Sequence, residues 1–177
     1  MDTSHRSSFF LKVLVLSLVI LGAAGPVCAE HATVIIPAQH PAELSKLELA
    51  AIRERVLQRC GLSSKLSENR LPWYFHYEFG VELINQGAAS QAIEPLQMTA
   101  NLKSESRRNA RMYGMWFVNY LPYYQMSLAW SELQKWDQAW DAIRISEEMQ
   151  EFSPGNTQYE KFSSLKELIE KSRKSNG

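Results

Sequence analysis

Two stretches of the chain, residues 72–102 and 122–150, share one pattern of apolar and polar positions. Each begins with an aromatic-rich amphipathic segment, passes through a tight turn, and ends in a second amphipathic segment that a small residue opens. Small or turn-forming residues recur at matching places in the two copies: Gly80, Gly87 and Ala92, and then Ser127, Gln134 and Ala139. Small residues let two helix backbones approach closely, so the pattern predicts one helical hairpin in each copy.

These positions resemble a tetratricopeptide repeat, whose hairpins stack into an array. The first copy matches through its small residue, turn glycine, second small residue and bulky partner, which are Gly80, Gly87, Ala92 and Leu96. The second copy matches through Tyr123, Ser127, Trp130, Trp136, Ala139 and Ile143. The intervening RMYGMWFVNYLPYY, residues 111–124, resembles a linker of exported bacterial repeat proteins. The resemblance implies an all-α fold, a short array of hairpins with a capping helix at each end.

The same resemblance implies a concave groove lined by the first helix of each hairpin. The matching positions are Tyr74, Tyr77, Val81 and Asn85 in the first copy, and Tyr124, Leu128 and Glu132 in the second. Tyrosines in such a groove bury a rigid ring and keep a hydroxyl for hydrogen bonding, which suits an extended peptide or a partner helix. The expected function is therefore a non-catalytic scaffold that binds another protein or a peptide segment.

Two further helices are expected to close the array, giving one helical domain over residues 41–171. The first begins at Pro41, carries an apolar stripe of Leu44, Leu47, Ala51 and Ile52, and stops at Gly61. The last opens on a capping box of Thr157 and Glu160, and residues 172–177 form a disordered tail. Within the first hairpin, Ser90 is the expected N-cap of the second helix. Pro95 predicts that this helix begins late or bends, and we expect the bend.

The insertion between the repeats, residues 103–121, has a polar, basic first half and a bulky apolar second half. We expect a short helix from about Ser106, broken near Gly114. Arg107, Arg108 and Arg111 have two interpretations: a solvated helix face paired with acidic neighbours such as Glu105, or a clamp for the carboxylates of a partner.

The amino terminus has the three parts of a secretory signal: a weakly positive start, an apolar segment from Val13 to Leu21, and small residues before Ala29. We predict cleavage after Ala29, which removes residues 1–29 and leaves a flexible leader of residues 30–40. The expected location is the periplasm. An uncleaved membrane anchor and lipidation at Cys28 are the alternatives.

Charge and chemistry narrow the remaining functions. Basic and acidic residues number 19 each, so the formal net charge of zero gives no general argument for nucleic acid or a membrane surface as a partner. Cys60 becomes the only thiol after cleavage, and its apolar neighbours favour burial. No phosphate loop, nucleophile elbow or metal-site spacing occurs, so no cofactor, metal or catalytic residue is expected.

Two alternatives to the scaffold remain open. One is an exported enzyme or small-ligand binder whose polar residues converge near His76 and Glu78, although a packed histidine is the simpler interpretation. The other is a structural homo-oligomer that uses exposed tyrosine and tryptophan side chains. The partner expected for the scaffold itself is another envelope or secreted protein.

Overall fold

The computed structural model describes residues 43–155 and 158–176. Within them the chain forms six α-helices, one short 3₁₀ helix and one two-stranded sheet. In chain order these are α1 (Lys46–Arg59), η1 (Glu68–Arg70), α2 (Trp73–Asn85), α3 (Ala89–Leu102), β1 (Arg107–Arg111), β2 (Phe117–Tyr120), α4 (Pro122–Glu132), α5 (Trp136–Glu148) and α6 (Tyr159–Asn176). The predicted signal, the leader, the start at Pro41 and the cap at Thr157 lie outside the described residues.

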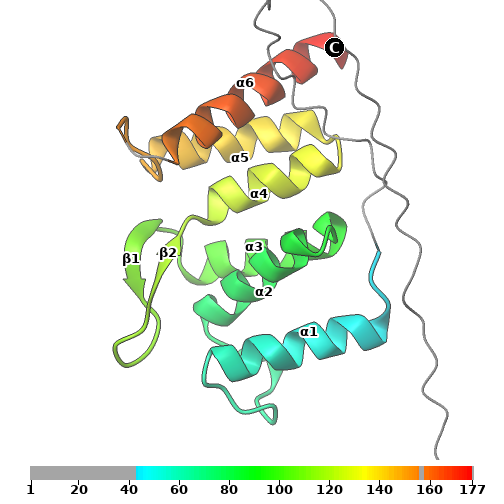
Figure 1. Ribbon diagram of the computed structural model, residues 1–177, viewed down its shortest axis with the longest axis vertical. Helices are drawn as coiled ribbons and strands as arrows, with labels where there is room; N and C mark the ends of the chain where they lie inside the picture. Colours follow the sequence, from blue (N-terminus) through cyan, green and yellow to red (C-terminus); the bar gives the residue numbers. More distant parts are fainter. Residues whose placement is uncertain (1–42, 156–157, 177) are drawn as a thin grey trace, which may run out of the picture. The chain divides into compact units, whose positions relative to one another are not determined.

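The helices pack in the order of the chain (Figure 1). The two predicted hairpins, α2 with α3 and α4 with α5, are the most extensive helix pairs, and they meet where α3 contacts α4. α1 packs against α2 and α6 packs against α5, so each end of the stack is covered by one helix. The mostly helical fold predicted from the sequence is therefore confirmed, with the small sheet as the exception.

Four helices end in the same way, through a residue in the left-handed conformation. These residues are Gly61, Gly87, Gln134 and Gln150, with φ of 65°, 74°, 56° and 54°. After each of them the next backbone N–H reaches back to a carbonyl in the last helical turn, as from Ala88 to Leu83 and from Lys135 to Trp130, both at 2.9 Å. Gly87 and Gln134 are the matched turn positions of the two copies, so the two hairpins turn with the same backbone geometry.

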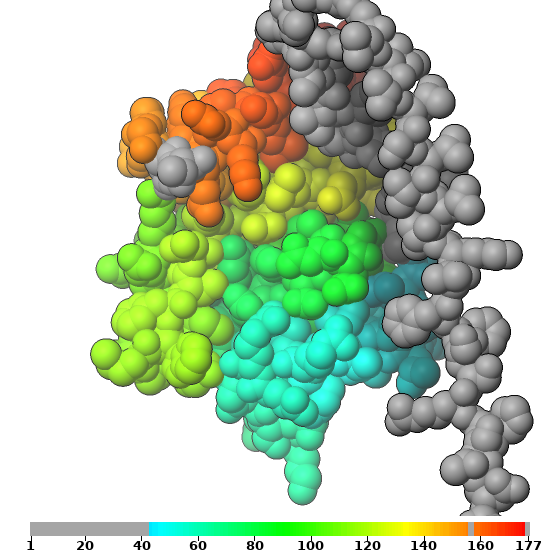
Figure 2. All heavy atoms as spheres, in the orientation of Figure 1, coloured from blue at the N-terminus to red at the C-terminus, as the bar shows by residue number. Residues whose placement is uncertain are grey.

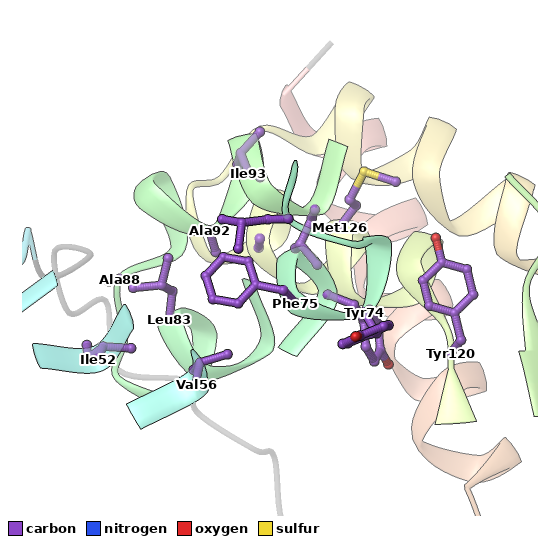
Figure 3. Close-up of a cluster of buried hydrophobic side chains, with 14 of the residues drawn as sticks. Ile52, Val56, Tyr74, Phe75, Leu83, Ala88, Ala92, Ile93, Tyr120 and Met126 are labelled. Atoms are coloured by element: carbon purple, nitrogen blue, oxygen red, sulfur yellow. The ribbon is translucent and has the colours of Figure 1, made fainter. Parts of the chain in front are cut away.

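The close helix approach predicted at Gly80 is present. A Cβ placed on Gly80 would lie 2.7 Å from Cγ of Leu96, which is completely buried on α3. Ala92, Ser127, Ala139 and the bulky partner Ile143 are also completely buried. Figure 3 shows side chains of α1, α2, α3 and α4 meeting Tyr120 of β2 in one apolar cluster. The small-and-bulky pattern thus reflects the packing of the hairpins.

The first helix starts later than the sequence indicated. Ser45 is its N-cap, and a capping box joins Ser45 to Glu48, while residues 43–45 are not helical. Leu47 of the predicted stripe is 81% exposed and Ala51 is exposed, whereas Ile52 is buried together with Val56 and Leu57. The predicted stripe was therefore wrong at Leu47 and Ala51, but it was right at Ile52 and at Leu44, which packs partly buried against the core. The start of the helix was misplaced because the capping box was overlooked.

Two other boundaries differ from expectation. α3 begins at Ala89 with Ala88 as its N-cap, so the cap predicted at Ser90 is wrong, and the helix runs through a buried Pro95 without a late start. α6 continues past residue 171 to Asn176. Arg173 explains this extension, because its guanidinium pairs with Asp137 at 2.7 Å and lies over the Trp140 ring, both on α5.

Candidate docking surface

The insertion between the hairpins folds as an antiparallel β-hairpin, residues 107–120, and not as the predicted helix. Ala110 is opposite Val118 and Arg111 is opposite Phe117. The connection turns at Gly114, whose φ is 51°, and the Met112 N–H bonds to the Trp116 carbonyl at 2.9 Å. The helix prediction failed because the bulky residues were counted together. Taken one by one, exposed Phe117 and Asn119 alternate with more buried Val118 and Tyr120, which is the period of a strand.

The base of this hairpin is fixed to the helical stack by Tyr120, which is completely buried. Its ring packs edge-on against Trp73 and Tyr77 of α2, with ring centres 4.7 and 5.0 Å away. Its hydroxyl oxygen lies 3.0 Å from the Thr99 carbonyl oxygen and 2.5 Å from that of Lys103. Burial raises the pKa of the Tyr120 phenol to about 12, so the group stays a neutral donor.

Tyr77 was predicted to line the groove, but this prediction is wrong because the hairpin covers the side chain. Its side chain is 4% exposed, and its hydroxyl donates to the Asn119 carbonyl at 2.7 Å. The same oxygen accepts the Leu121 N–H at 3.3 Å. Burial raises the pKa of Tyr77 well above its usual range. The phenol therefore joins α2 to the start of α4 and is not available to a partner.

Tyr74 was also expected in the groove, and it is buried too. Its ring centre lies 5.8 Å from that of Tyr113 on the hairpin. The Tyr113 hydroxyl in turn donates to the Arg59 carbonyl at the end of α1, at 3.1 Å. The hairpin thus packs against the aromatic side chains at the amino-terminal end of α2.

The remaining groove residues separate into two groups. Tyr124 is half-buried and packs against Phe152 and Phe162, at ring-centre distances of 4.7 and 6.5 Å, so it belongs to the core under α6. Asn85 and Glu132 are exposed at the carboxyl-terminal ends of α2 and α4. The structure does not bring these two residues into contact with the hairpin.

Glu151 is a residue that the sequence did not single out. It follows α5 and is 2% exposed. Its carboxylate accepts the backbone N–H of Tyr124 at 2.9 Å and of Tyr123 at 3.2 Å, the Ser146 hydroxyl at 2.7 Å, and the Ser106 hydroxyl. Burial raises the pKa of this carboxyl, and the four hydrogen bonds oppose the rise. Glu151 thereby caps α4 and joins it to α5 and to the residue before β1. No local pattern distinguishes it from the surface glutamates near it.

The three candidate arginines all lie on β1 and are exposed, although on a strand and not on the expected helix. Arg108 donates to the Glu151 carbonyl oxygen, with its Nη2 at 3.2 Å, and Arg111 Nε donates to the Gly114 carbonyl at 2.6 Å. In the described part of the chain, none of the three pairs with a carboxylate, and all ion pairs lie elsewhere. The pairing expected with Glu105 is therefore absent from these residues.

The far end of the hairpin exposes a run of large apolar side chains. We call Met115, Trp116 and Phe117 the tip; they are 81%, 64% and 51% exposed. The other large apolar side chains that are exposed among the described residues are separate from the hairpin: Leu47, Met98, Leu102 and Met149. Figure 2 shows the hairpin, in yellow-green, standing at the edge of the folded unit. The tip thus places three exposed apolar side chains next to one another at the far end of the hairpin.

The polar residues of the alternative enzyme site have structural roles. The ring of His76 is buried, and burial lowers its pKa despite the opposing effects of the Glu68 charge and of a hydrogen bond with the Leu71 backbone. Glu78 pairs with Arg59 at 3.2 Å. Among residues 43–155 and 158–176, no three acidic, histidine or cysteine side chains are grouped so that they could hold a metal ion. Over the same residues, none of the helices has the length and apolar character needed to cross a bilayer.

Comparison with protein-family models, with curated proteins and with solved structures finds no match to this chain.

Proposed function

We propose that this chain is a non-catalytic docking scaffold in which a tetratricopeptide-like helical stack holds the hairpin as its contact surface. The observation that supports this is the tip itself. Met115, Trp116 and Phe117 are more than half exposed, although the hairpin that carries them is anchored by buried hydrogen bonds. A folded chain gains nothing from three such side chains in water, so their exposure fits a partner that covers them.

The energetics of covering the tip favour binding. Burying a large apolar side chain stabilises a complex by about 1.5–3 kcal/mol, and tryptophan and arginine are the residues on which affinity most often depends. Because Tyr77 and Tyr120 already fix the base of the hairpin, little conformational entropy is lost when a partner binds. A preformed surface of this kind lowers the entropic cost of binding.

The proposal moves the contact surface away from the predicted groove. Tyr74, Tyr77 and Tyr124 support the fold, and only Asn85 and Glu132 remain exposed from that set. The predicted secretory signal makes the cell envelope the compartment of the proposed partner. We therefore propose that the hairpin docks onto a component of the envelope.

The test is co-sedimentation of the purified protein with the envelope fraction of its own cell. A triple variant, Met115→Ser with Trp116→Ser and Phe117→Ser, should lose at least about tenfold in affinity, as expected for the loss of more than 1.4 kcal/mol. The matched control replaces exposed apolar residues away from the hairpin, as Leu47→Ser with Met98→Ser and Leu102→Ser.

Helical circular dichroism should be unchanged in both variants. Equal sedimentation of the tip variant and the wild type would contradict the proposal. So would a wild-type dimer that the tip variant converts to monomer in size-exclusion chromatography, because the tip would then serve self-association.

A further inference from the structure

We propose that the surface onto which the hairpin docks is an anionic lipid bilayer, with the tip inserted at the level of the headgroups and Arg107, Arg108 and Arg111 bound to lipid phosphates. This inference rests on the proposed function, because it uses the same hairpin. It names the chemistry of the partner.

The shape of the tip favours a bilayer. Met115 and Trp116 stand on the outside of a turn, 81% and 64% exposed, so the apolar surface is convex. A protein partner would need a matching pocket for each side chain, whereas a lipid interface adapts to a convex surface. Tryptophan and phenylalanine are also the side chains that reside at the boundary between headgroups and acyl chains.

The charge of the hairpin favours an anionic surface. Residues 106–121 contain three arginines and no aspartate or glutamate. Along the chain the nearest acidic residue is Glu105, at the base. Glu151, which contacts Ser106 just before β1, has a buried carboxylate that already accepts four hydrogen bonds. Because the whole chain has a formal net charge of zero, this positive charge is local. Each arginine near an anionic bilayer raises affinity about fivefold.

Arg111 lies directly behind the tip, where headgroup phosphates would be, and Arg107 and Arg108 lie farther along β1 toward the base of the hairpin. Arg111 is the cross-strand partner of Phe117, and both are exposed. The bond from Arg111 Nε to the Gly114 carbonyl holds the guanidinium beside the turn and leaves its two terminal nitrogens for a phosphate. Trp116 stacks near Tyr113 with ring centres 6.3 Å apart, so the aromatic side chains of the turn share one side.

Extension of the sheet by a protein strand is disfavoured at both edges. On β1 the register shifts between Arg107 and Ala110, and Asn109 between them has a φ of 53°, so this edge is bulged. On β2 the Asn119 carbonyl already accepts the Tyr77 hydroxyl. A bulged edge and an occupied edge are poor templates for strand addition. The side chains of the tip and of β1 are therefore the groups that a partner meets.

The experiment uses the protein expressed from its full sequence and vesicles of two compositions, pure phosphatidylcholine and equimolar phosphatidylcholine with phosphatidylglycerol. Wild-type protein should bind the anionic vesicles, more weakly at high salt. Replacing all three hairpin arginines by glutamine should reduce this binding about a hundredfold, the product of the three separate effects. The control removes the same charge at exposed sites elsewhere: Arg55→Gln, Lys135→Gln and Lys171→Gln.

A second readout reports insertion of the tip. Quenching of tryptophan fluorescence by lipids brominated on the acyl chain should be strong for the wild type and reduced for Trp116→Phe, which keeps an aromatic ring and should still bind. Equal binding to neutral and anionic vesicles, or equal effects of the two charge-removing variants, would overturn the inference.

The two proposals fail separately. If wild-type protein binds neither kind of vesicle, while the tip variant still binds the envelope fraction more weakly than the wild type does, the docking function stands and its partner is a protein. If the tip variant binds both the vesicles and the envelope fraction as well as the wild type does, both proposals are wrong.

Discussion

The Tyr77 hydroxyl donates a hydrogen bond to the Asn119 carbonyl at 2.7 Å, between residues 42 positions apart in the chain. This bond joins the second turn of α2 to the strand that leads into α4. Tyr77 was expected to contact a partner, but through this bond its side chain fixes the hairpin on the helices. The exposed tip owes its fixed position to such buried contacts.

Replacing Tyr77 with phenylalanine should destabilise the protein. The ring keeps its packing against Tyr120, but the Asn119 carbonyl and the Leu121 N–H lose their partner in a buried setting. Leaving such groups unsatisfied costs about 1–3 kcal/mol, which chemical denaturation would measure. Tyr159→Phe is the matched control, since Tyr159 packs its ring against Phe162 and its hydroxyl has no hydrogen-bond partner among the described residues. Equal stability of the two variants would contradict the proposed role of Tyr77.

The helical hairpins could be predicted from the sequence because their pattern is local. Gly80, Gly87 and their matches are set by close approach and by turn geometry within about thirty residues. The close approach at Gly80 could be predicted for the same reason, since the residue that it meets, Leu96, lies in the adjacent helix of the same hairpin. The structure of a segment can be predicted from its local sequence pattern when the residues that it packs against are close to it in the chain.

The hairpin of residues 107–120 could not be predicted in the same way. Tyr120 is held by Thr99 and Lys103, Tyr113 by Arg59, and Asn119 by Tyr77, all through contacts that no local pattern encodes. The sequence did group the three arginines as candidates, but it could not show that they share a strand behind an apolar tip. Tertiary contacts decided the conformation of the insertion.

Glu151→Gln should change how stability depends on pH. Burial raises the pKa of the Glu151 carboxyl in the folded protein above its unfolded value, so folding favours the protonated form. The stability that this group contributes is complete below the unfolded pKa and is lost as pH rises through the folded pKa. Relative to Glu151→Gln, the free energy of unfolding of the wild type should therefore fall as pH increases from about 4 to about 7.

Denaturation at several pH values measures the difference in the free energy of unfolding between the wild type and Glu151→Gln. The contributions of the carboxyls that both proteins share cancel in this difference. Glu160→Gln, at an exposed position of α6, should give a smaller change of slope. A wild type that gains stability relative to Glu151→Gln over the same range would show that the hydrogen bonds outweigh burial.

Cys60 should resist alkylation in the folded protein. Its side chain is 1% exposed, and burial, reinforced by the charge of Glu78, raises the pKa of the thiol to about 12 despite the opposing charge of Arg59. The thiolate is the reactive form. Burial therefore slows alkylation in two ways, because it limits the access of the reagent and it lowers the fraction of Cys60 that is ionised. In a Cys28→Ser background, reaction with an aromatic disulfide reagent should be at least about a hundredfold slower than in denaturant. Reaction at the rate of an exposed thiol would contradict the buried position of Cys60.

Gly80→Ala tests the close approach of α2 and α3. The added Cβ would lie 2.7 Å from Cγ and 2.8 Å from Cδ2 of Leu96, whose side chain is completely buried. Overpacking of this kind costs about 1–3 kcal/mol, although alanine would otherwise favour the helix by about 1 kcal/mol. Chemical denaturation should show a net loss of stability.

The matched experiment repeats the substitution in a Leu96→Ala background. Leu96→Ala alone should cost about 2–5 kcal/mol through the cavity that it leaves. In that background the Cβ at position 80 meets empty space, so Gly80→Ala should be neutral or stabilising, and the two changes should couple by about 1–3 kcal/mol. Additive effects would mean that Gly80 and Leu96 do not touch, and the helical hairpin would then lack the contact from which its repeat pattern follows.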